Sequence, residues 1–266
     1  MTDAPVGPRA LPFVGFAALL RRDVRVARRE LPYFLTRTTL QPLLFVVVFG
    51  HLLPRMGFVN RAYTAALLPG ILGISLAFSS LQSVALPMVA DFGFTKEIED
   101  RLLAPVADWI VALEKVVSGI LQGVLAALFV LPIARLIMGP IPSLALGHPL
   151  EVLAVTVLGA ASFSTLGLVL GTVIQGQQIG LMFSIVVAPM IMFGCAYYPW
   201  TGLATIPWLQ YAVLVNPLVY VSEGMRGALT PTLPHMPVPA VLAALTLVTG
   251  LLWVAGLRTF RRRAFS

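Results

Sequence analysis

Long stretches without Asp, Glu, Lys or Arg dominate the chain and predict membrane-spanning helices. A helix needs about twenty mainly apolar residues to cross the hydrocarbon layer of a bilayer. Four of these runs predict one span each, whereas the longest, Val152 to Ser222, predicts two spans divided at the polar stretch 175–178. The six predicted spans are residues 38–54, 62–90, 116–134, 152–174, 179–198 and 238–257.

The distribution of basic residues predicts the orientation of these spans. In membrane proteins, Lys and Arg are enriched in the segments on the cytoplasmic side. If the N-terminus of this chain is cytoplasmic, the inner segments hold about three times as many Lys and Arg residues as the outer segments. Both termini are therefore predicted to be cytoplasmic. The outer basic residues are then Arg55, Arg61, Arg135 and Arg226, and the inner ones include Lys96, Arg101, Lys115, Arg258, Arg261, Arg262 and Arg263.

The N-terminal 37 residues predict an amphipathic helix. Apolar residues recur at steps of three or four from Phe13 to Leu31, which is typical of one helix face. Such a helix lies in the cytoplasmic interface with its cations near anionic headgroups. A disordered basic tail is the alternative, but it does not explain the apolar stripe. The opposite, basic face holds Arg21, Arg22, Arg25, Arg28 and Arg29.

Composition supports a membrane protein and argues against several other classes. Of the 266 residues, 58% are hydrophobic and 11% charged, with a mean hydropathy of +0.92, whereas soluble domains are about a quarter charged. The net charge of +7 is gathered near the chain ends, a pattern of membrane-surface anchoring and not of a nucleic-acid groove. One cysteine excludes an intramolecular disulfide and a cysteine-rich metal site.

Motifs for chemistry within this chain are missing from the sequence. Neither lysine, Lys96 or Lys115, sits in a phosphate-binding Gly-x4-Gly-Lys-Ser/Thr loop. The predicted span interiors carry no charge, which argues against a proton-coupled carrier. The chain is therefore expected to be no enzyme by itself, and to hold neither a metal nor a cofactor.

The predicted cytoplasmic loop 91–109 concentrates charge in an otherwise neutral protein. Ile98, Leu102, Val106 and Trp109 are spaced for one helix face, beside an acidic face. A short amphipathic helix of this kind is suited to docking a soluble partner, although an ordinary solvated loop explains the same residues. Its central residues are Lys96, Glu97, Glu99, Asp100, Arg101, Leu102, Leu103, Ala104 and Pro105.

The segment 199–230, before the last span, is apolar but broken by proline and tryptophan. Tyr198-Pro199 is followed by Pro207-Trp208-Leu209 and then by a run from Asn216 to Arg226. This pattern, together with the loop motif around Leu102 and Leu103, resembles the permease subunits of ABC type-2 exporters, especially those of the daunorubicin and nodulation lipo-oligosaccharide type. The outer motif consists of Asn216, Pro217, Tyr220, Glu223 and Arg226.

The resemblance implies an architecture and a set of partners. The fold would be all-α: an interfacial helix (1–37), a six-helix transmembrane domain (38–260) with short re-entrant outer helices at 199–230, and a basic tail (261–266). The loop from Lys96 to Pro105 would couple to a separate ATPase subunit, which binds ATP and Mg. Two permease chains, identical or different, would form the membrane unit in a bacterial inner membrane.

The expected function is outward movement of an amphipathic or lipid-linked substrate, such as a drug, glycolipid or lipo-oligosaccharide. Gln41, Gln82 and Gln122 are candidate pathway residues. Glu223 and Arg226, three residues apart, are expected to form a structural latch, with substrate contact as the alternative. A secondary transporter and a non-transporting membrane assembly subunit remain the alternative functions.

Overall fold

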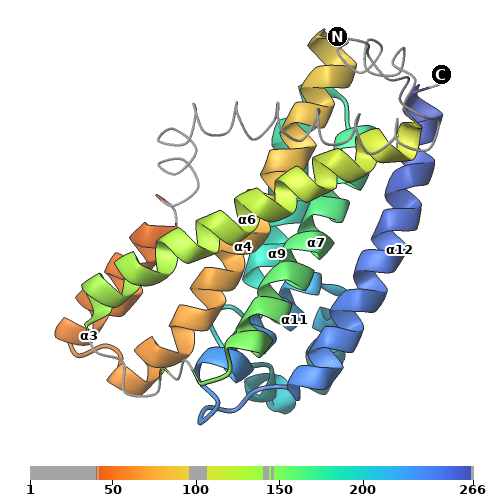
Figure 1. Cartoon of the computed structure of the whole chain (residues 1–266). Coiled ribbons are helices and arrows are strands. Elements are labelled where there is room, and N and C mark those ends of the chain that lie inside the picture. The colour runs from red at the N-terminus through yellow and green to blue at the C-terminus, as the bar shows by residue number, and fades with distance from the viewer. Residues whose placement is uncertain (1–39, 41, 96–106, 140–143, 145–146, 265–266) are drawn as a thin grey trace, which may run out of the picture.

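The computed structural model describes residues 40, 42–95, 107–139, 144 and 147–264, and every element in these ranges is helical. Four helices are long and apolar enough to cross a membrane. They form a bundle with one strongly tilted member, α6, as Figure 1 shows. The four are α4 (Arg61–Ala90), α6 (Asp108–Met138), α7 (Pro149–Val173) and α12 (Val238–Ala264).

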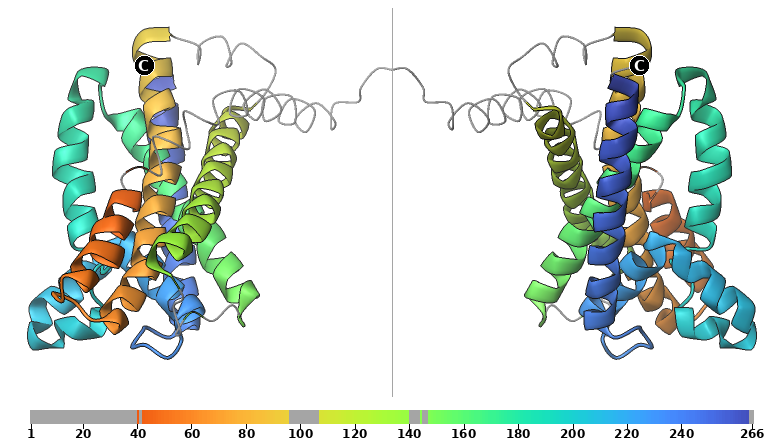
Figure 2. Two further views of the ribbon diagram at one scale, coloured as in Figure 1. Left: turned by 90° about the vertical axis from the view of Figure 1, so that its left-hand side faces the viewer. Right: turned by 90° about the vertical axis from the view of Figure 1, so that its right-hand side faces the viewer.

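Shorter helical segments complete the described part of the chain. Two apolar stretches, Pro42–Arg55 and Gly176–Met192, are helical but shorter than the four long helices. The second stands on the side of α4 that is opposite α6 (Figure 2). The short elements are η1 (Val46–Leu52), α3 (Leu53–Arg55), η2 (Asp91–Thr95), η3 (Gly176–Gln178), α8 (Ile179–Met182), η4 (Phe183–Val187), α9 (Ala188–Met192), η5 (Trp200–Thr205), α10 (Pro207–Ala212), η6 (Val213–Val215) and α11 (Pro217–Leu229).

Helix α4 is the centre of the bundle. It packs against α6, α7 and α11. In its most apolar stretch of 18 residues 89% is buried, whereas in the corresponding stretch of α12 only 17% is buried. Small residues permit this close approach: a Cβ added to Gly167 on α7 would lie 2.7 Å from the carbonyl oxygen of Leu81. Gly167 therefore lets α7 approach the backbone of α4 closely, which is how helices associate in lipid.

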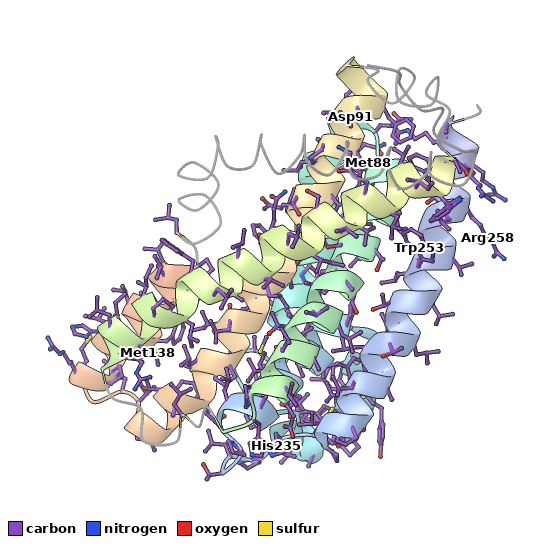
Figure 3. All side chains as sticks on the ribbon, in the orientation of Figure 1. Met88, Asp91, Met138, His235, Trp253 and Arg258 are labelled. Carbon is purple, nitrogen blue, oxygen red and sulfur yellow. The ribbon has the colours of Figure 1, made fainter. Side chains whose placement is uncertain are left out.

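The long helices join two ends of the molecule. Figure 3 shows Asp91 and Arg258 toward one end, and His235 at the other. We name these the Asp91 end and the His235 end. The short elements from η5 to α11 gather at the His235 end (Figures 1 and 2). The segment 199–230 therefore forms several short helices that all remain at this end of the bundle.

Three boundaries of the helices differ clearly from those of the predicted spans. The third predicted span begins at Val116, but α6 starts at Asp108 and so includes Glu114 and Lys115. The last predicted span ends at Leu257, but α12 continues to Ala264. The fifth predicted span ends at Tyr198, but α9 ends at Met192. The side-chain amide of Asn216, which caps α11, donates a hydrogen bond to the carbonyl oxygen of Met190 in the last turn of α9. After α9 the chain turns into the core, where Cys195 and Ala196 are buried.

Candidate functional site

The outer motif begins with the cap of helix α11. The Asn216 side-chain oxygen accepts a hydrogen bond from the backbone N–H of Leu218 at 3.0 Å, and Pro217 occupies the first turn, where its missing N–H costs nothing. The Asn216 amide also donates to the carbonyl oxygen of Met190 at 2.7 Å. One side chain therefore starts α11 and fixes it to the end of α9.

Two aromatic side chains hold the short elements at the His235 end to each other. The Tyr220 hydroxyl donates to the carbonyl oxygen of Leu214 at 2.8 Å. The Trp200 indole N–H donates to the carbonyl oxygen of Gln210 at 2.9 Å. Aromatic residues with one polar atom suit an interface that is apolar on one side and polar on the other. These bonds order the turns between η5 and α11.

Glu223 and Arg226 form a buried ion pair on α11. Their side chains are 0% and 1% exposed, and Arg226 Nη1 donates to Glu223 Oε1. The carboxylate also accepts the backbone N–H groups of Trp200 and Met236, each at 2.9 Å. The Arg226 Nη2 donates to the carbonyl oxygen of Cys195 at 3.0 Å. We name this set of contacts the outer latch, since it joins α11 to the chain on both sides of it.

The outer latch gives hydrogen-bond partners to both oxygens of Glu223 and to both terminal nitrogens of Arg226. A buried charge is strongly destabilising unless it is paired and hydrogen-bonded. Both Glu223 oxygens have partners, while Arg226 Nε has none among the described residues. These contacts fit the latch interpretation better than a substrate contact, because few polar atoms remain for a ligand. The role itself stays a prediction.

The stretch that supplies Cys195 is inserted into the helix bundle. Cys195 and Ala196 are fully buried, and Cys195 has a φ of 52°, a conformation that non-glycine residues rarely adopt. On α4, a Cβ at Gly70 would overlap the backbone of Ala196. Glycine at position 70 is therefore required for the insertion that brings the Cys195 carbonyl to Arg226.

A second group of charges lies near the Asp91 end. Lys115 Nζ lies 3.6 Å from Asp91 Oδ2, and both side chains are largely buried. Glu114 is 0% exposed on the same turn of α6. Glu114 and Lys115 both belong to α6 but precede the charge-free stretch 116–134 that was predicted as the third span. The buried charge of Lys115 is neutralised by Asp91.

Two of the three predicted pathway residues lie in the described part of the chain, on two helices that pack against each other. Gln82 on α4 and Gln122 on α6 are both half-buried, and the Gln122 amide donates to Ser118 Oγ at 3.4 Å within its own helix. Gln41 lies outside the described residues. Among the described residues no group of three His, Cys, Asp or Glu side chains is placed to hold a metal ion.

Two predicted sets of residues lie outside the described part of the chain. The first is the coupling set from Lys96 to Pro105, and the second is the group of interfacial arginines from Arg21 to Arg29. Sequence reasoning also missed the latch partners at Cys195, Trp200 and Met236. All three contribute backbone atoms, which leave no signal in residue type.

Comparison with known proteins identifies the family. The model of the ABC-2 type transporter family matches residues 14–230. The inner membrane transport permease YadH of Escherichia coli is 29% identical over 189 residues, which are 69% of this chain and 70% of the relative, and YadH of Shigella flexneri gives the same values. The chain belongs to the ABC-2 type transporter family. It is a multi-pass inner-membrane transport permease, as the resemblance in the loop and outer motifs predicted.

Proposed function

Because the chain belongs to this family, we propose that it is the permease subunit of an ATP-driven exporter. Its substrate is amphipathic or lipid-linked and moves outward across the cytoplasmic membrane. The observation that carries the proposal is the extent of the family match, from residue 14 to residue 230. That range contains both the loop 91–109 and the outer latch at Glu223 and Arg226, two features expected of an exporter permease.

Six spans with a cytoplasmic Asp91 end form the proposed topology. The four long helices supply four spans, and the shorter apolar helices Pro42–Arg55 and Gly176–Met192 supply the other two. Four arginines, from Arg258 to Arg263, lie in the last two turns of α12, and α12 ends at the Asp91 end (Figures 1 and 3). Basic residues favour the cytoplasmic side of a membrane, so both termini are cytoplasmic in this proposal.

A separate ATPase subunit drives the transport cycle. The sequence holds no phosphate-binding loop, so ATP and Mg bind to the partner. The loop from Lys96 to Pro105 docks into that partner at the cytoplasmic surface. ATP must bind the two states of the complex with different affinity, because a ligand with equal affinity for both would shift nothing. The loop transmits this difference to the permease.

The chemistry of the bundle supports an amphipathic substrate. The buried charges at Glu223 and Arg226 pair with each other, as do those at Asp91 and Lys115. These paired charges therefore stabilise the fold and do not offer a free charge to a substrate. Apolar side chains cover the exposed faces of the long helices, with examples at Leu128, Leu153 and Leu251. A second permease chain, identical or homologous, covers part of this surface in the complete exporter, and lipid covers the rest.

Reconstitution tests the proposal directly. The tagged permease is co-expressed with a P-loop ATPase encoded beside it, and the complex is placed in liposomes. We expect the two chains to co-purify, and ATP hydrolysis to rise when the correct amphiphile is added. Transport driven by an ion gradient without the ATPase would instead identify a secondary transporter. A stable complex that hydrolyses ATP but moves no lipid or amphiphile would identify an assembly subunit.

A further inference from the structure

The last turn of α12 contacts the chain on both sides of the segment 96–106. On the side that precedes the segment, the Arg263 guanidinium lies 5.0 Å from the ring centroid of Phe92, and the Phe260 ring packs edge-on against Phe92 at 5.8 Å. On the side that follows it, Arg261 Nε donates to Asp108 Oδ2 at 2.5 Å, and Nη2 donates to Oδ1 at 3.3 Å. The two attachments are sixteen residues apart in sequence but converge on one helical turn.

Arg263 also fixes this turn to the end of α7. Its Nη1 donates to the carbonyl oxygens of Thr172 and Ile174, each at 2.8 Å. The last carbonyl groups of a helix have no partner within the helix, so Arg263 supplies a cap for α7. The Thr172 and Thr259 hydroxyls add a 2.7 Å hydrogen bond between the same two helices. The end of α12 is therefore fixed to α7 as well as to the base of the loop.

The neighbouring basic residues do not share these contacts. Arg258 and Arg262 are exposed and form no hydrogen bond or ion pair with the described part of the chain. If the cluster served only to anchor the membrane surface or to set topology, all four arginines would be equivalent. Instead, Arg261 and Arg263 contact the residues that flank the segment 96–106, whereas Arg258 and Arg262 do not.

We propose that Arg261 and Arg263 are positioning residues that hold both ends of the coupling loop to α12. A displacement of the loop by the ATPase then moves α12 as a unit. This inference rests on the proposed function, since it assumes that the loop docks into an ATPase. An isolated exposed ion pair contributes little to stability, so the Arg261–Asp108 bond acts on position and only weakly on folding.

The other end of α12 extends this link to the outer segment. Val238 to Ala264 is one continuous helix, about 40 Å long at 1.5 Å per residue. The backbone N–H of Met236, two residues before the helix, is bonded to Glu223 in the outer latch. A movement received at Arg261 and Arg263 therefore reaches α11 through a single rigid helix.

A fluorescent reporter at the outer segment tests this link. Trp208 on α10 is 71% exposed and Cys195 is fully buried, so Trp208→Cys offers one accessible thiol for an environment-sensitive fluorophore. The labelled permease is reconstituted with its co-purified ATPase, and the fluorescence is compared in Mg-ATP and Mg-ADP. We expect a nucleotide-dependent change in the parent.

Two pairs of substitutions with the same loss of charge decide the question. Arg261→Ala with Arg263→Ala should reduce the nucleotide-dependent change about fivefold or more, a typical loss of coupling between two sites. The ATPase should still co-purify with this variant. The control, Arg258→Ala with Arg262→Ala, should keep the full response. Equal responses from the two variants would overturn the inference and leave the proposed function intact.

A charge exchange keeps the test decisive if the double alanine variant fails to fold. Arg261→Asp should lose the response, and the addition of Asp108→Arg should restore it, because the pair is rebuilt in reverse. Failure of the exchange to restore a response lost in Arg261→Asp would contradict the positioning role. If the parent complex binds no ATPase, the proposed function fails, and the inference fails with it. If the ATPase binds and is active but the parent gives no nucleotide-dependent change, the inference alone fails.

Discussion

Glu223 and Arg226 form an ion pair that is almost completely buried, and each of them also binds backbone atoms from outside α11. The pair thus links the inserted stretch near Cys195, the start of η5 and the connection to α12. A pair of this kind determines the conformation of the outer segment, because either charge alone would be buried without compensation. The latch interpretation therefore makes a stability prediction that a substrate contact does not.

Removing only the positive charge of Arg226 should destabilise the protein more than removing the charges of both Arg226 and Glu223. Arg226→Met leaves the Glu223 carboxylate buried and should destabilise the protein by about 3–5 kcal/mol. Adding Glu223→Gln removes that charge while keeping an acceptor for one backbone N–H, so the double variant should be more stable than Arg226→Met. The measurement is the melting temperature of the purified protein in detergent.

The control for this comparison is Arg135→Met. Arg135 is exposed at the end of α6, and its substitution should change stability by no more than about 0.5 kcal/mol. If Arg226→Met melts like the control but transport is lost, the pair contacts substrate and is not a latch. Strictly additive destabilisation in the double variant would also argue against an ion pair.

Gly70 should tolerate no side chain, because a Cβ there would overlap the Ala196 backbone. Gly70→Ala is expected to displace the inserted stretch and to destabilise the protein by about 1–3 kcal/mol, as overpacking of a core does. Gly250→Ala on α12 is the matched control, since nothing lies within 4 Å of its added Cβ. Thermal unfolding in detergent measures both. Equal melting temperatures would mean that the 193–199 stretch is not held against α4.

Residue patterns predicted the long helices well because lipid-facing helices are defined by length and apolar composition. Helix α4 was predicted at 62–90 and is found at Arg61–Ala90, and α7 agrees within a few residues at each end. The start of α6 was missed because two adjacent charged residues, Glu114 and Lys115, mark the end of an apolar run when only the sequence is considered. The ion pair that compensates the burial of Lys115 is made by Asp91, which comes from another element.

The candidate site was predicted only in part. Asn216, Glu223 and Arg226 were singled out by the family resemblance of their motif, and each makes polar contacts that fit a structural role. The groups that they bind are mostly backbone atoms, at Met190, Cys195 and other residues. Any residue type supplies such atoms, so no pattern of side chains could have revealed them. Their positions depend on the tertiary fold.

Both ends of the chain should be cytoplasmic. About three-quarters of the Lys and Arg residues fall on the inner side in the six-span topology, and this bias sets orientation during insertion. A reporter enzyme that is active only outside the cell should therefore be inactive when fused after Ser266. The same reporter inserted at Gly147, in the predicted outer connection before α7, should be active. The reverse result at either position would refute the topology.

The loop at Lys96 to Pro105 should bind the ATPase through a few central residues. In such interfaces a few anchors each contribute roughly 2 kcal/mol or more on truncation. We expect Leu102 to supply an apolar anchor and Asp100 a polar contact. Leu102→Ala combined with Asp100→Ala should therefore leave the permease inserted but release the ATPase or uncouple it from transport, as judged by co-purification and by transport in liposomes.

A leucine and an acidic residue on the other side of the proposed membrane topology provide the control for that loop variant. Leu150 is 79% exposed and Glu151 follows it near the start of α7, so Leu150→Ala with Glu151→Ala removes similar groups from the His235 end. We expect normal co-purification and transport from it, because an ordinary solvated position changes binding by only about 0.5 kcal/mol. If the Leu102 and Asp100 variant behaves like this control, the loop is not the docking element. The amphipathic stretch around Arg21 to Arg29 would then be the next surface to truncate, since it is the other amphipathic segment predicted on the cytoplasmic side.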